Sequence, residues 1–239
     1  TCKENLDHFG GPGPFSLEIE EYLCGVVPSE IGDRSHPDAL MAQAVAARTY
    51  AVKKTQAGMV LNDTAGNHAF RVSRIDSPNS RKAIQDTRGM VLCHGGNVIN
   101  CFYSASNGGV TKRSGDVWRQ NYPYYVNKID EWDVNANREK PTKVSHGVGL
   151  SQIGVMWAAK QGLTHEAILA FYYEGTTIAA DYGRRGSSVS EEPHDEKGDS
   201  SLVLHERIMA KNDSYQYGRK INPARHSHTH GQRNMEYQH

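Results

Sequence analysis

The chain has 239 residues, which is enough for one large domain or two small ones. Its 27 basic and 27 acidic residues give a formal net charge of zero, so charge does not favour nucleic acid or an anionic membrane as a partner. No run of 18 apolar residues is present, so no membrane-spanning helix is predicted. No signal peptide is visible and the first residue is Thr1, which we interpret as the trimmed ectodomain of a longer protein.

The stretch from Glu20 to Tyr50 is the one around which the chain is organised. Apolar residues at helical spacing predict a first helix at about 17–27, and Pro28 is expected to limit its length. The sequence SHPD at 35–38 is typical of a helix N-terminus, and an alanine-rich stretch continues to about residue 57. Because alanine lets neighbouring elements approach closely, this second helix is predicted to be the central buried helix.

Three polar or amphipathic residues lie on that predicted core helix, namely Gln43, Arg48 and Tyr50. Buried polar groups need partners, and two hypotheses supply them. In the first, Arg48 pairs with a carboxylate and Gln43 bonds to a loop. In the second, Glu30 lies in a cleft that Gln43 or Arg48 lines. The residue types alone favour the first hypothesis.

The remaining elements follow from turn and capping signals. Gly95-Gly96 predicts the turn of a β-hairpin, and Thr164 is a good cap for a helix that follows it. The predicted helices are 80–87, 151–160 and 166–173, the hairpin strands are 91–93 and 98–104, and irregular strands are expected at 111–118 and 122–129.

The four cysteines are Cys2, Cys24, Cys93 and Cys101, and none has the Cys-x-x-Cys spacing of a zinc or redox motif. A two-residue hairpin turn sets Cys93 opposite Val98, so a disulfide between Cys93 and Cys101 is not expected. We interpret the cysteines as small buried apolar residues.

The two ends of the chain differ in composition from its middle. Residues 1–15 contain GGPGPF, which predicts a flexible N-terminal arm. Residues 183–239 are mostly polar and are predicted to form a disordered tail, in which only LVLHERIM at 202–209 could form a short helix or strand. The alternating histidines within 226–230 could hold a metal ion, but no surrounding framework fixes their geometry.

Three blocks of sequence together resemble a known family. They read YLCGVVPSEIG…HPDALMAQAVAARTYAVK, GMVLCHGGNVINCFYSASNGGVT and SHGVGLSQIGVMWAAKQGLTHEAILAFYYEGTTI, and they span about residues 17–180 in the family's order. The family is that of stage II sporulation protein D, a group of peptidoglycan lytic transglycosylases that includes amidase-enhancer-like domains. The resemblance implies an α+β domain at 16–182, with a central Ala-rich helix packed against further helices and a small, mostly antiparallel sheet.

The resemblance implies that Glu30 is the catalytic acid and base. Glycosidic cleavage needs a proton on the leaving oxygen, and apolar neighbours such as Val27 and Ile31 would raise the pKa of a glutamate toward that task. A lytic transglycosylase can act with one carboxylate, because the C6 hydroxyl of the substrate's own N-acetylmuramic acid attacks the anomeric carbon. A structural role is enough to explain each nearby aspartate, Asp33 in a turn and Asp38 in the first turn of a helix. Neither is therefore needed for the chemistry.

The resemblance also implies a set of substrate-binding residues. Gln43 and Arg48 would orient the sugar or Glu30, and Tyr103 and Tyr173 would stack on sugar faces. A serine hydrolase is not indicated, because no Gly-x-Ser-x-Gly motif accompanies the Ser and His residues. The full set is Gln43, Arg48, Tyr103, Ser104, Ser106, Gly108, Gly109, His146, Ser151, Gln152 and Tyr173.

The implied function is cleavage of the MurNAc-GlcNAc bond of glycan strands during spore engulfment, on the extracytoplasmic side and beside membrane-anchored wall hydrolases. The alternative is a non-catalytic wall-binding module that enhances an N-acetylmuramoyl-L-alanine amidase. No cofactor is expected; some relatives bind zinc through Cys and His, but those ligands are not matched here, and no nucleic-acid partner is expected. The family normally carries a long segment where this chain has only residues 134–145, so strands of the substrate cleft are expected to be missing.

Overall fold

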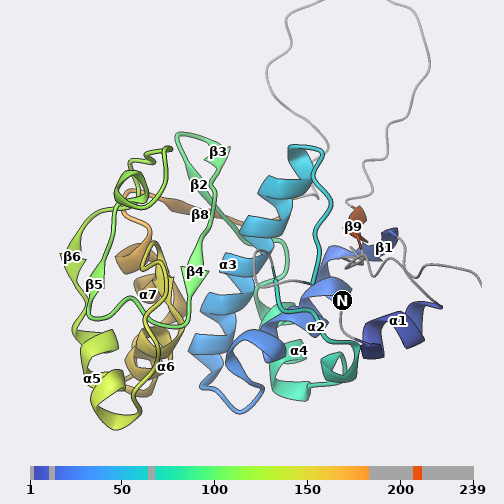
Figure 1. Cartoon of the computed structure of the whole chain (residues 1–239), viewed down its shortest axis with the longest axis horizontal. Helices are drawn as coiled ribbons and strands as arrows, with labels where there is room; N and C mark the ends of the chain where they lie inside the picture. The colour runs from blue at the N-terminus through green and yellow to red at the C-terminus, as the bar shows by residue number, and fades with distance from the viewer. Residues whose placement is uncertain (1–2, 11–13, 64–67, 183–206, 212–239) are drawn as a thin grey trace, which may run out of the picture.

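The computed structural model of the chain describes residues 3–10, 14–63, 68–182 and 207–211 (Figure 1). Within these residues, helices and small sheets are mixed along the chain, which confirms the predicted α+β class. The helices are α1 (Lys3–Phe9), α2 (Ile19–Ile31), α3 (Pro37–Gln56), α4 (Pro78–Asp86), α5 (Glu131–Glu139), α6 (Gln152–Lys160) and α7 (His165–Tyr172), with 3-10 turns η1 (Val72–Arg74) and η2 (Ser114–Asp116).

The strands are short and form four small sheets. A three-stranded antiparallel sheet has the order β3-β2-β8, and the pairs β1-β9 and β5-β6 are also antiparallel, whereas β4 and β7 pair in parallel. The strands are β1 (Pro14–Glu18), β2 (Val91–His94), β3 (Asn97–Val98), β4 (Tyr103–Ser104), β5 (Val110–Thr111), β6 (Lys128–Ile129), β7 (Leu150–Ser151), β8 (Thr177–Ala179) and β9 (Arg207–Lys211).

Helix α3 is the centre of the molecule, as its composition predicts. It packs against α2, α4, α6, α7 and β2, and Figure 1 shows it between α2 and α4 on one side and α6 and α7 on the other. Small side chains make this possible, because they let five elements approach one helix. The helix begins with Pro37, and the His36 ring accepts a hydrogen bond from the Asp38 backbone N–H.

Helix α2 continues through Pro28 to Ile31, one turn further than the sequence predicts. Pro28 has no backbone N–H, so one helical hydrogen bond is missing, and the nearby carbonyl of Gly25 accepts hydrogen bonds from other donors. The carbonyl of Gly25 accepts bonds from the Ser29 hydroxyl at 2.7 Å and from the Arg71 backbone N–H at 3.1 Å. The extra turn places Glu30 in the helix, near its C-terminal end.

The N-terminal residues form a docked helix where the sequence predicts a flexible arm. The side chain of Asn5 is buried and donates to Asp63 at 2.8 Å and to the carbonyl of Phe70 at 3.0 Å. Its carbonyl oxygen accepts a bond from the Val72 backbone N–H. The flexible arm was predicted from the glycines and prolines that follow α1. The hydrogen bonds of Asn5 could not be predicted, because its partners are distant in the sequence.

Most of the predicted tail, including its alternating histidines, lies outside the described residues. The described part, Arg207–Lys211, is strand β9, and it pairs with β1 in the register Pro14↔Lys211 to Glu18↔Arg207. It lies at the end of LVLHERIM, the one tail segment for which a short helix or strand was expected.

The hairpin register is as predicted, with Cys93 opposite Val98, and Cys24, Cys93 and Cys101 are free and buried. Thr164 caps α7 as expected. Helix α5 was missed, because its sequence lacks an apolar repeat. It is held instead by Asp130, whose side chain accepts the backbone N–H of Asp133.

Gly25 is required by a close approach of Phe70. A Cβ at residue 25 would lie 2.4 Å from a ring carbon of Phe70, and that ring is itself stacked on Tyr22 at 5.5 Å. Gly25→Ala gains about 1 kcal/mol of helix propensity but must displace the ring, so we expect the free energy of unfolding to fall by about 1–2 kcal/mol in urea titrations.

A double-mutant cycle isolates the cause of that loss. Phe70→Leu provides space for the new methyl group, so Gly25→Ala should cost less in the Phe70→Leu background than in the wild-type chain. Equal costs in the two backgrounds would contradict the steric explanation.

Candidate functional site

Glu30 is held at the meeting point of three chain segments. Its Oε1 accepts the backbone N–H of Ala69 at 2.8 Å, and its Oε2 accepts Nε2 of Gln152 at 2.8 Å. Glu30 comes from the last turn of α2, Ala69 from the segment before η1, and Gln152 from the first residue of α6. The structure therefore brings together two residues that the sequence predicts for the site, Glu30 and Gln152.

Burial raises the pKa of the Glu30 carboxyl above its ordinary value, although the bonds from Ala69 and Gln152 and the nearby Tyr103 hydroxyl act in the opposite direction. Among the described residues, the groups that shift this pKa include no Lys or Arg and no second carboxylate. The C-terminal end of α2 carries partial negative charge, which also disfavours the ionised form. The site therefore favours a protonated glutamate more than an exposed position would.

Aromatic side chains surround this carboxyl. The hydroxyl of Tyr103 is buried and forms no hydrogen bond of normal geometry with the described residues, yet it lies close enough to influence Glu30. Glu30 in turn raises the pKa of both Tyr22 and Tyr103, although burial is the larger cause in each case. The tyrosine rings thus form a wall of low polarity around the acid.

His68 completes this wall, and the sequence gave no sign of it. Its ring lies 4.7 Å from Tyr50 and 5.7 Å from Tyr103, and its Nδ1 is hydrogen bonded to the Tyr22 hydroxyl at 3.0 Å. Burial lowers the pKa of His68 to about 3, so the ring is neutral at physiological pH. A neutral ring adds no positive charge that would stabilise the Glu30 carboxylate.

Gln43 is fully buried on α3, and neither atom of its amide group has a hydrogen-bond partner among the described residues. The expected bond from Gln43 to a loop is therefore not found, and no described contact joins it to Glu30. Ser104 is also buried, with an unpartnered hydroxyl. The roles of Gln43 and Ser104 at the site stay predictions, because no described contact joins either residue to Glu30.

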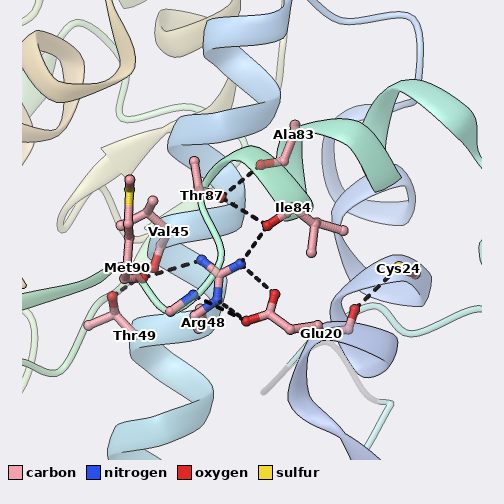
Figure 2. Close-up of polar contacts among 10 residues, drawn as sticks. Glu20, Cys24, Val45, Arg48, Thr49, Ala83, Ile84, Thr87 and Met90 are labelled. Carbon is pink, nitrogen blue, oxygen red and sulfur yellow. Dashed lines mark hydrogen bonds and ion pairs between the residues drawn. The ribbon is translucent and has the colours of Figure 1, made fainter. Parts of the chain in front are cut away.

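Arg48 has a structural role, which corrects its predicted place in the cleft (Figure 2). It is 1% exposed and forms a bidentate pair with Glu20, with Nε–Oε1 at 3.0 Å and Nη2–Oε2 at 2.7 Å. Its remaining bonds go to the carbonyls of Ile84 and Met90, both at 3.2 Å. The Arg–carboxylate hypothesis is thus the correct one for Arg48, because four bonds occupy its guanidinium.

The turn that contains Ser106 and Gly109 is also committed to structure. The buried carboxylate of Asp133 accepts bonds from the Ser106 hydroxyl and from the backbone N–H groups of Asn107 and Gly109. It also accepts the hydroxyl of Ser151 at 2.5 Å. The predicted donors at Ser106, Gly109 and Ser151 therefore bind Asp133, and they are not directed at a sugar.

A second buried carboxylate, Asp130, ties the same turn to α7. It accepts Nδ2 of Asn107 at 2.6 Å and the Tyr172 hydroxyl at 2.8 Å, and burial raises its pKa. Gly108 keeps a positive φ of 75°, and its backbone N–H donates to the Ser106 hydroxyl. The sequence did not assign Asp130 or Asp133 a role, because their partners come from distant elements.

Two other predicted residues differ in their accessibility. Tyr173 is fully buried and donates to the carbonyl of Phe102 at 2.9 Å, so it cannot stack on a sugar. His146 is half-buried, its Nδ1 accepts the Val148 backbone N–H, and burial lowers its pKa. The nearby Tyr103 backbone acts in the opposite direction on that pKa.

Asp33, in the turn between α2 and α3, and Asp38, in the first turn of α3, each accept a backbone N–H at the start of another helix. Oδ1 of Asp33 accepts the backbone N–H of Ser80 at 2.7 Å in the first turn of α4. Oδ1 of Asp38 accepts the backbone N–H of His165 at 3.0 Å at the start of α7. Each stabilises a free N–H group at a helix N-terminus, so both have structural roles, although the contacts to α4 and α7 were not expected.

Across the described parts of the chain, no group of three or more His, Cys, Asp or Glu side chains could hold a metal ion. Within those same parts, none of the helices has the length and apolar character needed to cross a membrane.

The fold and site define an α+β domain with one partly buried, aromatic-walled glutamate. Residues 15–94 match the family model described as Stage II sporulation protein. The matched range contains Glu30, His68 and Ala69, whereas Gln152 lies beyond it. The family match therefore covers the helix that carries Glu30 but not the residue that donates to its Oε2.

Individual relatives point to the same family. The chain is 40% identical over 111 residues to the Amidase enhancer of Bacillus subtilis (strain 168), across 46% of this chain but 15% of that protein. It is 22% identical over 260 residues to Stage II sporulation protein D of the same organism, across 69% and 75% of the two chains. It is 27% identical over 150 residues to Stage II sporulation protein D of Bacillus amyloliquefaciens, across 54% of this chain and 43% of that one. Over these parts of its length, the chain is similar to proteins of the stage II sporulation protein D family.

The pairing of Arg48 with Glu20 predicts a loss of stability rather than of ligand binding. Glu20→Gln leaves a buried guanidinium without its countercharge, so we expect the free energy of unfolding to fall by about 3 kcal/mol or more in urea titrations. Asp86→Asn is the matched control, because the Lys82–Asp86 pair is 75% and 44% exposed and should cost at most about 0.5 kcal/mol. Equal losses in the two variants would contradict the structural role of Arg48.

The contact with Gln152 predicts the direction of a pKa change at Glu30. Gln152 donates to the carboxylate and so lowers its pKa, and Gln152→Ala should raise that pKa further, as measured by carbon NMR of labelled glutamate. Gln161→Ala, at the exposed C-terminal end of the same helix, should leave it unchanged.

The same shift has a consequence for stability. The folded protein binds the Glu30 proton more tightly than the unfolded chain does, so this contribution to stability is present at low pH and is lost as pH rises through the folded pKa. The free energy of unfolding of Glu30→Gln, relative to that of the wild-type chain, should therefore be higher at neutral pH than at pH 4. A lower relative stability at neutral pH would contradict a raised pKa.

Proposed function

We propose that the chain is a lytic transglycosylase that cleaves the MurNAc-GlcNAc bond of peptidoglycan glycan strands and leaves 1,6-anhydromuramyl ends. The observation that carries this proposal is the Glu30 carboxyl, fixed by Ala69 and Gln152 where burial raises its pKa. A carboxyl of this kind suits general acid catalysis at neutral pH.

In the proposed reaction, protonated Glu30 gives its proton to the glycosidic oxygen as the bond from that oxygen to the anomeric carbon breaks. The C6 hydroxyl of the same N-acetylmuramic acid attacks the anomeric carbon and closes the anhydro ring. The Glu30 carboxylate takes the proton from that hydroxyl, which restores the acid. No water is consumed, so one carboxylate serves both steps.

The contacts of Glu30 are compatible with both protonation states. In the carboxylate form, Ala69 and Gln152 each donate to one oxygen. In the acid form, rotation of the Gln152 amide by half a turn would present its carbonyl oxygen to the new O–H group. The nearby Tyr103 hydroxyl can likewise donate or accept.

The other acids near this part of the chain support a mechanism with one carboxylate. Asp33 and Asp38 cap α4 and α7, and Asp130 and Asp133 are buried within the network of the Ser106 turn. A hydrolase would need a second carboxyl group about 5–9.5 Å from the acid and free to act on substrate or water. Each of these four is occupied with structural bonds.

The biological setting is proposed from the relatives. Proteins named Stage II sporulation protein D suggest a role in sporulation, which we infer to be remodelling of the cell wall during engulfment. Such a lyase would act outside the cytoplasm, beside membrane-anchored wall hydrolases.

A second candidate has an observation of its own. The 40% identity to the Amidase enhancer supports a non-catalytic wall-binding module that increases the activity of an N-acetylmuramoyl-L-alanine amidase. The raised pKa of Glu30 favours the enzyme, because a module that only binds has no need of a protonated acid.

Glu30→Gln tests the proposal directly. The amide is nearly isosteric but cannot serve as an acid, so cleavage of purified glycan strands should fall by about 100- to 10,000-fold while the fold and glycan binding are kept. Glu21→Gln, an exposed position on the same helix, should cleave at the wild-type rate. Mass spectrometry should show product ends that are lighter by one water than hydrolysis gives.

Two results would count against the enzyme. Near wild-type turnover by Glu30→Gln would remove the acid from the mechanism. Reducing ends at every new cut would indicate a hydrolase.

A further inference from the structure

Of the residues predicted to stack on sugar faces, Tyr173 is fully buried and the Tyr103 hydroxyl is closed off from solvent. Among the described aromatic side chains, Trp118 is the one with large exposure, at 39%. It lies directly after η2, in a stretch to which the sequence assigned no function. A single exposed aromatic ring is common on protein surfaces, so a use for Trp118 has to be argued from its neighbours.

The Trp118 ring is supported on two sides rather than free to move. Its centroid lies 4.8 Å from Phe102 and 5.1 Å from His146, with interplanar angles of 50° and 53°. Its backbone N–H donates to the carbonyl of Ser114 at 2.7 Å, and the buried Ser114 hydroxyl accepts the Tyr122 backbone N–H at 2.9 Å. A ring held in this way loses little freedom when a ligand covers its open face.

This ring is continuous with the acid site. Phe102, which packs against Trp118, lies 6.3 Å from Tyr50, and the Tyr50 ring lies 4.7 Å from His68. The His68 ring is stacked on Tyr103 at 5.7 Å, and the Tyr103 hydroxyl is close enough to Glu30 to lower its pKa. Trp118 is therefore the exposed end of the aromatic wall that surrounds the carboxyl.

Most of the exposed residues close to Trp118 in the sequence are polar, although the adjacent Val117 is apolar. Arg113, Asp116, Arg119 and Gln120 are all exposed, and Arg113 pairs with Asp116 at 3.0 Å. A flat apolar ring edged by hydrogen-bonding groups matches a pyranose, which presents C–H bonds on its face and hydroxyl or acetamido groups around its rim. An apolar protein partner would be expected to meet a broader apolar surface.

We propose that Trp118 is the stacking platform of a sugar subsite for aminosugar glycan, with His146 as its side wall. The ligand rests on the proposed function, since the glycan is the polymer that Glu30 would cleave, but stacking on Trp118 requires no cleavage. The subsite holds one pyranose of the strand at the exposed end of the aromatic wall that reaches Glu30.

Tryptophan fluorescence of the full chain tests this subsite, with the Glu30→Gln variant as host so that no substrate is consumed. The probe is a soluble tetramer of N-acetylglucosamine. We expect saturable quenching that Trp118→Ala abolishes, together with binding weakened by about tenfold or more in calorimetry, a loss typical of removing a stacking aromatic ring. Trp118→Phe keeps a smaller ring and should bind with intermediate affinity, which guards against misfolding of the alanine variant.

Two controls assign the signal. Trp132→Phe removes an indole that packs on Phe171 at 4.2 Å, and it should leave the quenching intact. Val117→Ala changes the adjacent exposed side chain and should leave the affinity unchanged.

The outcomes separate this proposal from the function of Glu30. If Trp118→Ala loses tetramer binding and the chain with native Glu30 does not cleave glycan, the subsite is supported and only the proposed enzyme is overturned. Cleavage with wild-type KM in Trp118→Ala, or quenching that persists without Trp118, would overturn the subsite and leave the enzyme standing. No saturable quenching by the tetramer at millimolar concentration would overturn the subsite as well.

Discussion

The buried pair of Arg48 and Glu20 fixes the frame on which the site depends. It joins the middle of α3 to the start of α2, and the same guanidinium binds the carbonyls of Ile84 at the end of α4 and Met90 before β2. A buried charge pair adds little net stability compared with apolar packing, but it allows few alternative geometries because every donor needs its acceptor. Helix α2 is thereby fixed at its first turn, and Glu30 lies at its other end.

The rest of the site depends on segments that are distant in sequence. Ala69 and Gln152, the two donors to Glu30, are 39 and 122 residues away from it. Ala69 is held by the packing of Phe70 on Gly25, and Gln152 is held by Ser151, whose hydroxyl binds Asp133 and caps α6. The acid is therefore placed by two supports that share no residue.

The sequence predicted the central helix and the hairpin register, because these follow from local signals. Alanine content indicates close packing, and Gly95-Gly96 fixes the pairing of Cys93 with Val98. The role of Glu30 is implied by the family resemblance and stays a prediction. The sequence could not predict His68 or the partner of Arg48, because each depends on which surfaces meet in three dimensions. The backbone groups of the Ser106 turn looked free for a ligand only because Asp133, which binds them, lies on a helix without an apolar repeat.

Helix α5 also gives the short segment at 134–145 a structural role that the sequence did not predict. The resemblance to the family implied that strands of the cleft are missing there, yet α5 at Glu131–Glu139 contributes to the site's support. Asn137 on α5 donates to both the Ser106 hydroxyl and the Asp133 carboxylate, at 3.1 and 2.8 Å. Asp133 in turn binds Ser151, the residue before Gln152, so the short segment is linked to Glu30 through consecutive hydrogen-bonded residues. Residues 134–139 therefore contribute to the support of Glu30, and the exposed Trp118 lies on the preceding segment.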